Sequence, residues 1–342
     1  DANITEDHNV VGIPIKKATK KGAKLIVIDS REVELTRYAY IWLRPRPGTT
    51  LILLCAMLRV ILDEVLYDSE FLKEKCDGFE DLEASIGVFN LDDATRLTGV
   101  PQELVKEVAH IYATSSTSSI VYALDNVSNN AEYAHVQALA DLALLTGNLG
   151  KPGAGLYALR HGTNEQGAID VGCAPDFLPG YQPLATEPGK NVKEAFQAAR
   201  DGKVKAMVIM GDSPTYSNGE IDNAHEALRC LEFLVVHDTF LSPIAKLAHV
   251  VLPAATVVDD DGTYTNIERR VQLLNRILVS ENGNYESESG WRCVSRIARQ
   301  MGAEGFDFES ASEVFDEVAR SAPIYHGISY ERLRRESKLI MR

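Results

Sequence analysis

Short β-branched runs that alternate with stretches of helical length are the feature that most limits how this sequence can fold. Such runs are typical of strands buried in a parallel sheet, and the longer stretches between them supply the crossover helices. Residues 50–66 have an apolar face too wide for a surface helix, so we expect a buried helix there. The strand-like runs are LIVID at 25–29, IWLR at 41–44, SSIVYAL at 118–124, KAMVIMG at 205–211, EFLVVHD at 232–238 and one within KLAHVVLPAAT at 246–256.

The alternation is interrupted at residues 147–168, GNLGKPGAGLYALRHGTNEQGA, which hold six glycines and show neither a strand nor a helix period. A long irregular segment inside a compact protein is usually functional or disordered. The alternation resumes after it, and from residue 287 to the end the pattern is helical. We therefore expect an α/β protein of two doubly wound, Rossmann-like α/β/α domains joined by a functional loop, with a helical C-terminal tail.

Charge and cysteine usage exclude several classes of function. The net charge is −14, whereas binding to a nucleic-acid backbone needs a basic surface, so we expect no nucleic-acid partner. The five cysteines are scattered and never in CxxC spacing, which argues against a disulfide framework and against a cysteine metal cluster. No apolar run approaches the roughly 18 residues of a membrane span, so we expect no membrane insertion.

Three polar stretches fall where an open α/β sheet binds its ligands, beyond the carboxyl ends of the strands. Asp29-Ser30-Arg31 could bind a ribose hydroxyl, a guanine edge or a phosphate, but a solvated strand end with a capping serine fits the spacing equally well. Residues 210–220 form a common strand–glycine turn, which is a weak signal by itself. Residues 259–272 begin with three acids beside a glycine, which is more typical of a solvated hairpin tip or loop than of a metal site. The residues alone indicate nucleotide-binding-like units and no definite reaction.

A longer set of ordered motifs resembles a known family. LTGNLGKPGAGLYALRHGTNEQGAIDVGCAPDFLPGYQPL at residues 145–184 is similar to the central part of the bis-molybdopterin guanine dinucleotide (bis-MGD) oxidoreductases, the dimethyl sulfoxide reductase family. Within that family it most resembles the catalytic α subunits of formate dehydrogenases. Further motifs follow in the family's order: GAKLIVIDSRE at 22–32, PGTT at 47–50, MGDSP at 210–214 and DGTYTNIERRVQ at 261–272.

The resemblance implies a domain organisation and a cofactor. Residues 1–159 would form a first α/β dinucleotide-binding domain that is incomplete at its N-terminus, residues 160–305 a second, and residues 306–342 a helical tail towards a C-terminal cap domain. Molybdenum or tungsten would be held by bis-MGD, and Arg160 would orient the substrate carboxylate through its guanidinium fork. The implied cofactor-binding residues are Asn3, Asp29, Arg31, Gly48 and Thr49 for one dinucleotide, Gly211, Asp212, Pro214, Asp238, Ser242 and Asn266 for the other, and Gly162, Asn164 and Gln166 in the loop.

Three departures from the family pattern stand out. Where formate dehydrogenases typically read RGQNNVQG, residues 160–167 read RHGTNEQG, which leaves the substrate identity open. His249 replaces the acid that is usual in ADVVLP, and Asp1 stands where the family has glycine.

The resemblance also implies segments that this sequence does not contain: an N-terminal [4Fe–4S] domain, the stretch with the selenocysteine, cysteine or serine metal ligand, and the cap domain. We therefore expect the chain by itself to hold no cofactor and to be inactive. For the parent protein we expect formate or another small carboxylate as substrate, iron–sulfur electron-transfer subunits as partners, and a cytoplasmic location. The alternative is a non-catalytic scaffold or electron-transfer subunit related to the large iron–sulfur subunit of NADH dehydrogenase. Arg160, Asp29 and Arg31 favour the enzyme, because a scaffold needs no pterin or carboxylate ligands.

Overall fold

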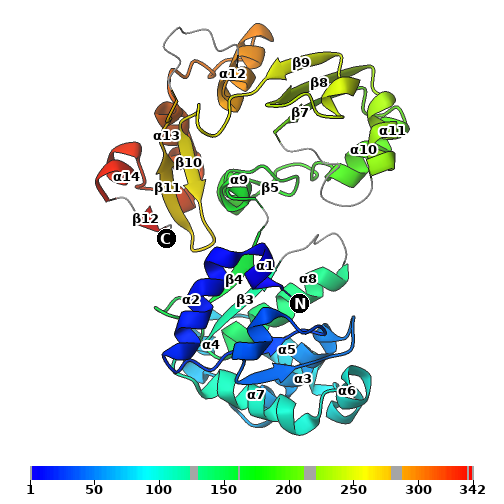
Figure 1. The fold of residues 1–342 in the computed structure, drawn as a ribbon, viewed down its shortest axis with the longest axis vertical. Helices are drawn as coiled ribbons and strands as arrows, with labels where there is room; N and C mark the ends of the chain where they lie inside the picture. The colour runs from blue at the N-terminus through cyan, green and yellow to red at the C-terminus, as the bar shows by residue number, and fades with distance from the viewer. Residues whose placement is uncertain are drawn as a thin grey trace. The chain divides into compact units, whose positions relative to one another are not determined.

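The computed structural model describes residues 2–123, 130–160, 162–211, 221–278, 287–336 and 339–340. The chain divides into two compact units, Asp1–Arg160 and His161–Arg342, and each is described by itself (Figure 1). Two of the predicted cofactor residues, Asp212 and Pro214, lie outside the described residues. The predicted domain borders at residues 159 and 305 stay a prediction.

The first unit is built from parallel strand pairs and helices, as the alternation of strand-like and helical segments predicts. Its described strands are β1 (Ile26–Ile28), β2 (Ile41–Leu43), β3 (Ser119–Ala123) and β4 (Gly155–Leu159). Its described helices are α1 (Ile4–Asp7), α2 (Asn9–Lys20), the 3-10 helix η1 (Glu34–Tyr38), α3 (Thr50–Asp63), α4 (Ser69–Lys75), α5 (Phe79–Gly87), α6 (Leu91–Thr98), α7 (Gln102–Thr114) and α8 (Asn130–Leu145). β1 pairs in parallel with β2, with Ile26 opposite Ile41, and β3 pairs in parallel with β4, with Ser119 opposite Gly155.

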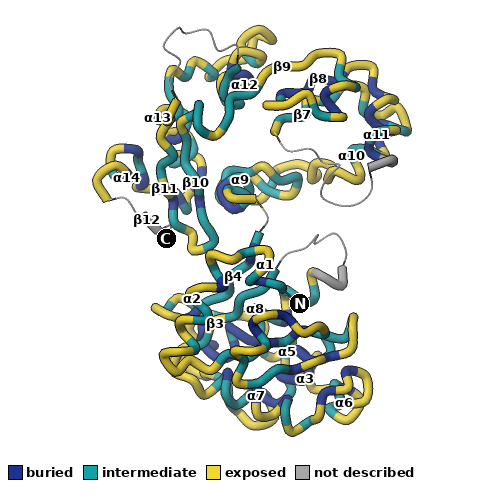
Figure 2. Tube along the Cα trace, viewed as in Figure 1, coloured by how far each residue is buried: buried dark blue, intermediate teal, exposed yellow. Residues whose placement is uncertain are grey.

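Helix α3 forms the centre of the hydrophobic core of the first unit, which confirms the buried helix expected at residues 50–66 (Figure 2). Leu53, Leu58 and Ile61 on this helix are fully buried. The helix is enclosed by α7, α8 and α6, which contribute buried residues such as Val108 and Leu142 to the same core. Complete burial of each such side chain contributes about 1.5–3 kcal/mol, so α3 holds the scaffold from which the strand ends project.

The glycine-rich segment is more regular than its sequence suggests, and the expectation of neither strand nor helix there is wrong. GLYAL forms β4, because the edge of β3 offers a continuous row of backbone hydrogen-bond partners and Leu159 is buried on pairing. Residues EQGAID form the short helix α9 (Glu165–Asp170). The density of glycines hides both elements from a period-based prediction.

The second unit combines a parallel sheet with an antiparallel hairpin. Its described strands are β5 (Phe177–Leu178), β6 (Gln182–Pro183), β7 (Ala206–Met210), β8 (Phe233–Asp238), β9 (Val250–Pro253), β10 (Gly262–Thr265), β11 (Arg270–Leu274) and β12 (Leu339–Ile340). Besides α9, its described helices are η2 (Pro179–Tyr181), α10 (Val192–Arg200), α11 (Ile221–Arg229), η3 (Ala245–Leu247), α12 (Gly290–Gln300), α13 (Ala311–Ser321), η4 (Pro323–Tyr325) and α14 (Tyr330–Glu336). β7, β8 and β9 form a parallel sheet in that order, as predicted. β10 and β11 form an antiparallel hairpin. The three acids at residues 259–261 precede β10, so they lie in a loop, one of the two predicted alternatives, and not at the hairpin tip.

The C-terminal segment packs against this hairpin and is not helical throughout, so the expected wholly helical tail needs correction. β12 adds to β11 in antiparallel register, with Val271 opposite Leu339. The exposed edge of β11 explains this, because an unpaired strand edge favours addition of another strand. Phe315, Tyr325 and Leu333 from the helices of the tail share a core with Val271. Among the described residues no helix is long and apolar enough to cross a membrane, and no cluster of His, Cys, Asp or Glu suits a metal ion.

His249 illustrates how a departure from the family pattern fits the fold. It stands just before β9. Its backbone N–H donates to the carbonyl of Leu234, and its side-chain Nδ1 accepts the backbone N–H of Leu234, both at 2.9 Å. Leu234 is fully buried in β8, so its N–H depends on this acceptor. A carboxylate oxygen can accept the same bond, which is why an acid and a histidine can serve at one position.

We predict that His249→Asp is close to neutral, whereas His249→Leu lowers the free energy of unfolding by about 1–3 kcal/mol, because it leaves a buried N–H without an acceptor. Urea unfolding of both variants tests this. A Leu variant as stable as the wild type would show that the Leu234 N–H finds another partner.

Candidate functional site

The first candidate site lies at the carboxyl end of β1, where Asp29 is only 1% exposed. Its Oδ1 accepts the backbone N–H of Arg31 at 2.8 Å, while its Oδ2 is buried and has no hydrogen-bond partner among the residues that the structure describes. The N–H of Asp29 donates to the carbonyl of Leu43, and Trp42 Nε1 donates to the carbonyl of Asp29 at 2.9 Å, so the ends of β1 and β2 lie side by side. A buried carboxylate oxygen without a donor is costly, and a ligand that supplies one would relieve that cost.

Gly48 and Thr49 lie between β2 and the N-terminus of α3. Gly48 has φ +79°, a conformation that favours glycine, and no atom lies within 4 Å of the position its Cβ would take. The hydroxyl and N–H of Thr49 both donate to the carbonyl of Arg46, at 2.7 and 3.1 Å, so the Thr49 side chain does not cap the helix. Helix N-termini bind anions through the backbone N–H groups of the first helical turn. Because β1 and β2 are parallel, this helix end lies at the same sheet edge as Asp29.

The other predicted residues of this unit are less closely tied to Asp29. Arg31 has an exposed side chain that makes no hydrogen bond or ion pair to a described residue. Asn3, which precedes α1, donates its side-chain amide to Glu6, and no contact within the described part of the chain joins it to Asp29. Arg160 is half-buried and directly follows β4, at the carboxyl end of the second parallel pair.

In the second unit, the carboxyl ends of β7 and β8 bring two predicted residues together. The N–H of Gly211 donates to the carbonyl of His237 at 3.0 Å, which places Gly211 beside Asp238. Gly211 has φ +79° and open space at its Cβ position. The Oδ1 of Asp238 accepts the N–H of Phe240 at 3.2 Å, and Ser242 Oγ accepts the N–H of Ala245 at 3.2 Å. This edge has the form of a nucleotide site in an open α/β sheet.

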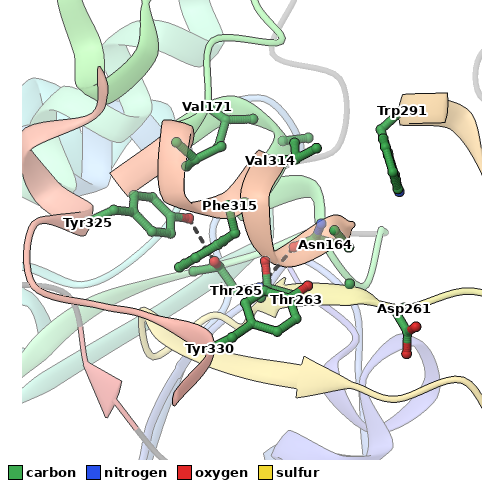
Figure 3. Close-up of a pocket in the computed structure, with 15 residues that line it drawn as sticks. Asn164, Val171, Asp261, Thr263, Thr265, Trp291, Val314, Phe315, Tyr325 and Tyr330 are labelled. Atoms are coloured by element: carbon green, nitrogen blue, oxygen red, sulfur yellow. Dashed lines mark hydrogen bonds between the residues drawn. The ribbon is translucent and has the colours of Figure 1, made fainter. Parts of the chain in front are cut away.

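Two more of the predicted residues, Asn164 and Asn266, contact the hairpin or lie in its turn. Asn164 Oδ1 accepts the N–H of Thr265 at 2.8 Å, a contact between residues 101 apart in the sequence (Figure 3). A Cβ at Gly167 would overlap Asn164 Oδ1, so a larger residue there would displace the Asn164 amide from Thr265. Gly162 donates its N–H to Glu165 at 3.4 Å, just ahead of α9. The side chain of Asn266, in the turn after β10, accepts the N–H groups of Glu268 and Arg270 at 2.9 and 3.0 Å.

Gln166, a predicted cofactor residue, is 7% exposed and faces into the protein. Its Nε2 donates to Asp170 Oδ1 at 2.7 Å and to the hydroxyl of Tyr181 at 3.1 Å. Asp170 itself is 0% exposed and also accepts bonds from Tyr181 at 2.6 Å and from Arg269 at 3.2 Å. The sequence motifs predict no role for Asp170, Tyr181 or Arg269, although AIDVG, LPGY and NIERR contain them. That two neutral donors and one cation surround the Oδ1 of a buried acid can be seen only in the structure.

The hairpin also lines a cavity of about 310 Å³. Figure 3 shows Phe315, Tyr325 and Tyr330 on its aromatic side, with Asn164 and Thr265 on its polar side. The hydroxyls of Thr265 and Tyr325 lie 2.8 Å apart. Burial, with the nearby Asp261 and Asp260 carboxylates as smaller causes, raises the pKa of Tyr330 to about 12. Burial also raises the pKa of Tyr181 and of Tyr325.

Comparison with known proteins shows the family of the chain. The sequence profile of the family described as molybdopterin oxidoreductase matches residues 1–300. The chain belongs to the molybdopterin oxidoreductase family. Its relatives include the F420-dependent formate dehydrogenase 1 subunit alpha of Methanococcus maripaludis, 35% identical over 347 residues, which are 97% of this chain and 51% of that protein. Another is the F420-dependent formate dehydrogenase subunit alpha of Methanocaldococcus jannaschii, 37% identical over 97% of this chain and 51% of that protein.

A solved structure supports the fold of this molybdopterin oxidoreductase chain. Acetylene hydratase from Pelobacter acetylenicus superimposes with a TM-score of 0.76 over 99% of this chain and 51% of that chain, at 22% sequence identity. At this identity the likeness concerns the fold alone, and it confirms the predicted α/β class. The chain spans about half the length of these curated relatives and of this structure.

The raised pKa of Tyr330 predicts how the stability of the second unit depends on alkaline pH. In the unfolded chain a tyrosine loses its proton near pH 10, whereas in the folded chain Tyr330 keeps it to about pH 12. The unfolded state therefore binds fewer protons between these values, and stability falls as the pH rises from about 10 to about 12.

Tyr330→Phe should reduce this loss, measured as the free energy of unfolding in urea from about pH 9 to about pH 12. Tyr133→Phe, at an exposed tyrosine, is the control and should leave the slope unchanged. Equal slopes in the wild type and the Tyr330 variant would contradict the prediction.

Proposed function

We propose that the protein containing this chain oxidises formate, or a closely similar small carboxylate, at molybdenum or tungsten held by bis-MGD. Two observations support the proposal: the formate dehydrogenase α subunits among the relatives, each matched over 97% of this chain, and the position of Arg160 after β4. Because the chain spans about half of those relatives, the activity of the whole protein and its iron–sulfur electron-transfer partners are part of the proposal.

The residues of the first unit fit one dinucleotide. The unpartnered Oδ2 of Asp29 is the observation that carries this assignment, because a guanine N–H or a ribose hydroxyl would supply its missing donor. Gly48 and Thr49 lead into the N-terminus of α3, where backbone N–H groups suit a pyrophosphate. Arg31 has an exposed guanidinium next in sequence to this edge and can pair with a phosphate.

The residues of the second unit fit a second dinucleotide at the edge formed by Gly211 and Asp238. The open space at the Cβ position of Gly211 lets a ligand approach the backbone, and the Asp238 carboxylate accepts only one hydrogen bond from described residues, so an oxygen is available to a guanine edge. Ser242 follows within the same turn. Asn164 and Asn266, at the hairpin, would contact this dinucleotide, whereas the side chain of Gln166 is directed to the buried Asp170.

In this proposal Arg160 binds the substrate carboxylate. An arginine suits this task because its planar fork makes two parallel hydrogen bonds to a carboxylate and stays charged at any working pH. When bound, the metal cofactor supplies the acceptor for the two electrons released as formate becomes carbon dioxide and a proton. Arg160 fixes the orientation of the carboxylate, and so the direction of the C–H bond, before those electrons leave.

We predict that Arg160→Lys in the intact protein raises KM for formate about tenfold or more, because lysine keeps the charge but loses the paired geometry, and each hydrogen bond to a charged group contributes about 1.5–3 kcal/mol. Steady-state kinetics measures the effect. Arg96→Lys, on the exposed face of α6, is the matched control. Unchanged kinetics in both Arg160→Lys and Arg160→Ala would rule out the substrate role.

We predict that Asp29→Asn lowers the guanine dinucleotide retained by the purified intact protein, because it turns the unpartnered acceptor into a donor. Asparagine Oδ1 can still accept the Arg31 N–H, so the free energy of unfolding of the cofactor-free protein should stay within about 1 kcal/mol. Dinucleotide content after denaturation, measured by chromatography, is the test, with Asp63→Asn on α3 as the exposed control. Full retention in the Asp29 variant would contradict the assignment.

A further inference from the structure

Asp170, at the C-terminal end of α9, is a fully buried carboxylate that joins four segments of the second unit. Its Oδ1 accepts three donors, from Gln166 at 2.7 Å, Tyr181 at 2.6 Å and Arg269 at 3.2 Å. Its Oδ2 accepts the hydroxyl of Tyr325 at 3.4 Å. A buried carboxylate is tolerated only when it is paired and hydrogen-bonded, and here both conditions hold. The four donors come from α9, from η2, from the turn after β10 and from η4.

Two of these donors reach Asp170 from strained backbone. Tyr181 and Arg269 both have φ +61°, in the left-handed region that non-glycine residues seldom adopt. Such a backbone conformation is strained, and it persists only where the surroundings of the residue determine it. Around Arg269 they do, because Asn266 Oδ1 accepts the N–H groups on both sides, from Glu268 and Arg270. The strain thus serves to aim two side chains at one carboxylate.

The same network fixes the start of α9 against the hairpin. Asn164 Oδ1 accepts the N–H of Thr265, and Gly167 leaves the space that this close approach needs. Asp170 lies one turn beyond Gln166, so its pairing with Arg269 closes a loop of contacts: α9, Asp170, Arg269, the turn with Asn266, Thr265 and back to Asn164. Neither the start of α9 nor the hairpin turn can shift without breaking a buried hydrogen bond.

We propose that Asp170 is a positioning residue which, through Arg269 and Gln166, holds Asn164 at the start of α9 and Asn266 in the hairpin turn as one preformed surface for the cofactor. The inference rests on the proposed function, since it takes Asn164 and Asn266 to face the dinucleotide. Gln166 then contributes by orienting α9 and not by touching the ligand. Preformed placement matters because ordering two loops during binding would consume binding free energy.

The hairpin offers a matched control. Arg270, next to Arg269, pairs with Glu268 at 3.1 Å, and Glu268 is exposed, whereas Asp170 is buried. Arg269 is half-exposed, but removing it leaves the buried Asp170 carboxylate without its cation, whereas an exposed pair contributes little. Asp170→Asn and Arg269→Gln are therefore compared with Glu268→Gln and Arg270→Gln. Tyr181→Phe, which removes a single donor, is the milder variant if the others fail to fold.

The first test is amide hydrogen exchange of the intact protein, which needs no activity. In Asp170→Asn we expect the amides of Thr265, Glu268 and Arg270 to exchange about tenfold faster or more, while Val235 in β8 is unchanged. Arg269→Gln should raise the unfolding equilibrium constant of the unit about a hundredfold, and Glu268→Gln less than about fivefold. Unchanged exchange in the Asp170 and Tyr181 variants, or equal effects in the control pair, would overturn the proposal.

The second test measures the dinucleotide retained by the same proteins and KM and kcat for formate. Asp170→Asn and Arg269→Gln should retain less dinucleotide than the wild type. Arg269→Lys, which keeps a cation beside Asp170, should retain more than Arg269→Gln. Faster exchange with full retention would overturn the positioning role and leave the proposed function intact. Loss of dinucleotide in a protein whose wild type does not oxidise formate would support the positioning role and overturn the proposed substrate.

Discussion

Parallel pairing of short strands is the constraint on which the candidate sites depend. In a parallel sheet the carboxyl ends of neighbouring strands meet at one edge, and the helix that follows a strand begins at that edge. In the first unit this brings Asp29 beside the segment that ends in Thr49 and α3. In the second unit it brings Gly211 beside Asp238. The residues predicted to bind the cofactor need not be close in sequence, because the strand register places them together.

The hairpin of the second unit solves a different problem. A turn and a short helix have little core of their own, so their mutual placement depends on specific polar contacts. Asp170 supplies these by concentrating three donors on one oxygen. A low local dielectric strengthens such a network when it is fully satisfied and makes each broken bond expensive. The result is a rigid junction between segments about a hundred residues apart, which the hydrophobic core beside Phe315 and Tyr325 supports.

The sequence predicts the strands and the buried helix well because their signals are local. β-branched runs predict β1, β7 and β8, and the wide apolar face of α3 predicts that this helix is buried. The prediction fails at β4, β5, β6 and β12, since a strand is formed there by the partner it finds and not by its own period. β4 contains glycine at its start, and β5, β6 and β12 are each two residues long. Asp29 could be chosen from its place after a strand. That its Oδ2 is left without a donor could not be predicted, because this depends on how Leu43 and Trp42 are placed around it.

Motif resemblance by itself does not separate a residue that touches a ligand from one that holds its neighbours. Gln166 and Asn164 stand two positions apart in one motif. The side-chain amide of Gln166 donates to the buried Asp170, whereas the side chain of Asn164 accepts a backbone N–H of the hairpin. His249 shows the converse, where a residue foreign to the motif keeps the same function as an acceptor for Leu234. What a family pattern preserves in such cases is the hydrogen-bonding capacity of a position. Burial and the direction of each donor then decide whether that capacity is used within the protein or stays available to a ligand, and among the described residues no donor uses the Oδ2 of Asp29.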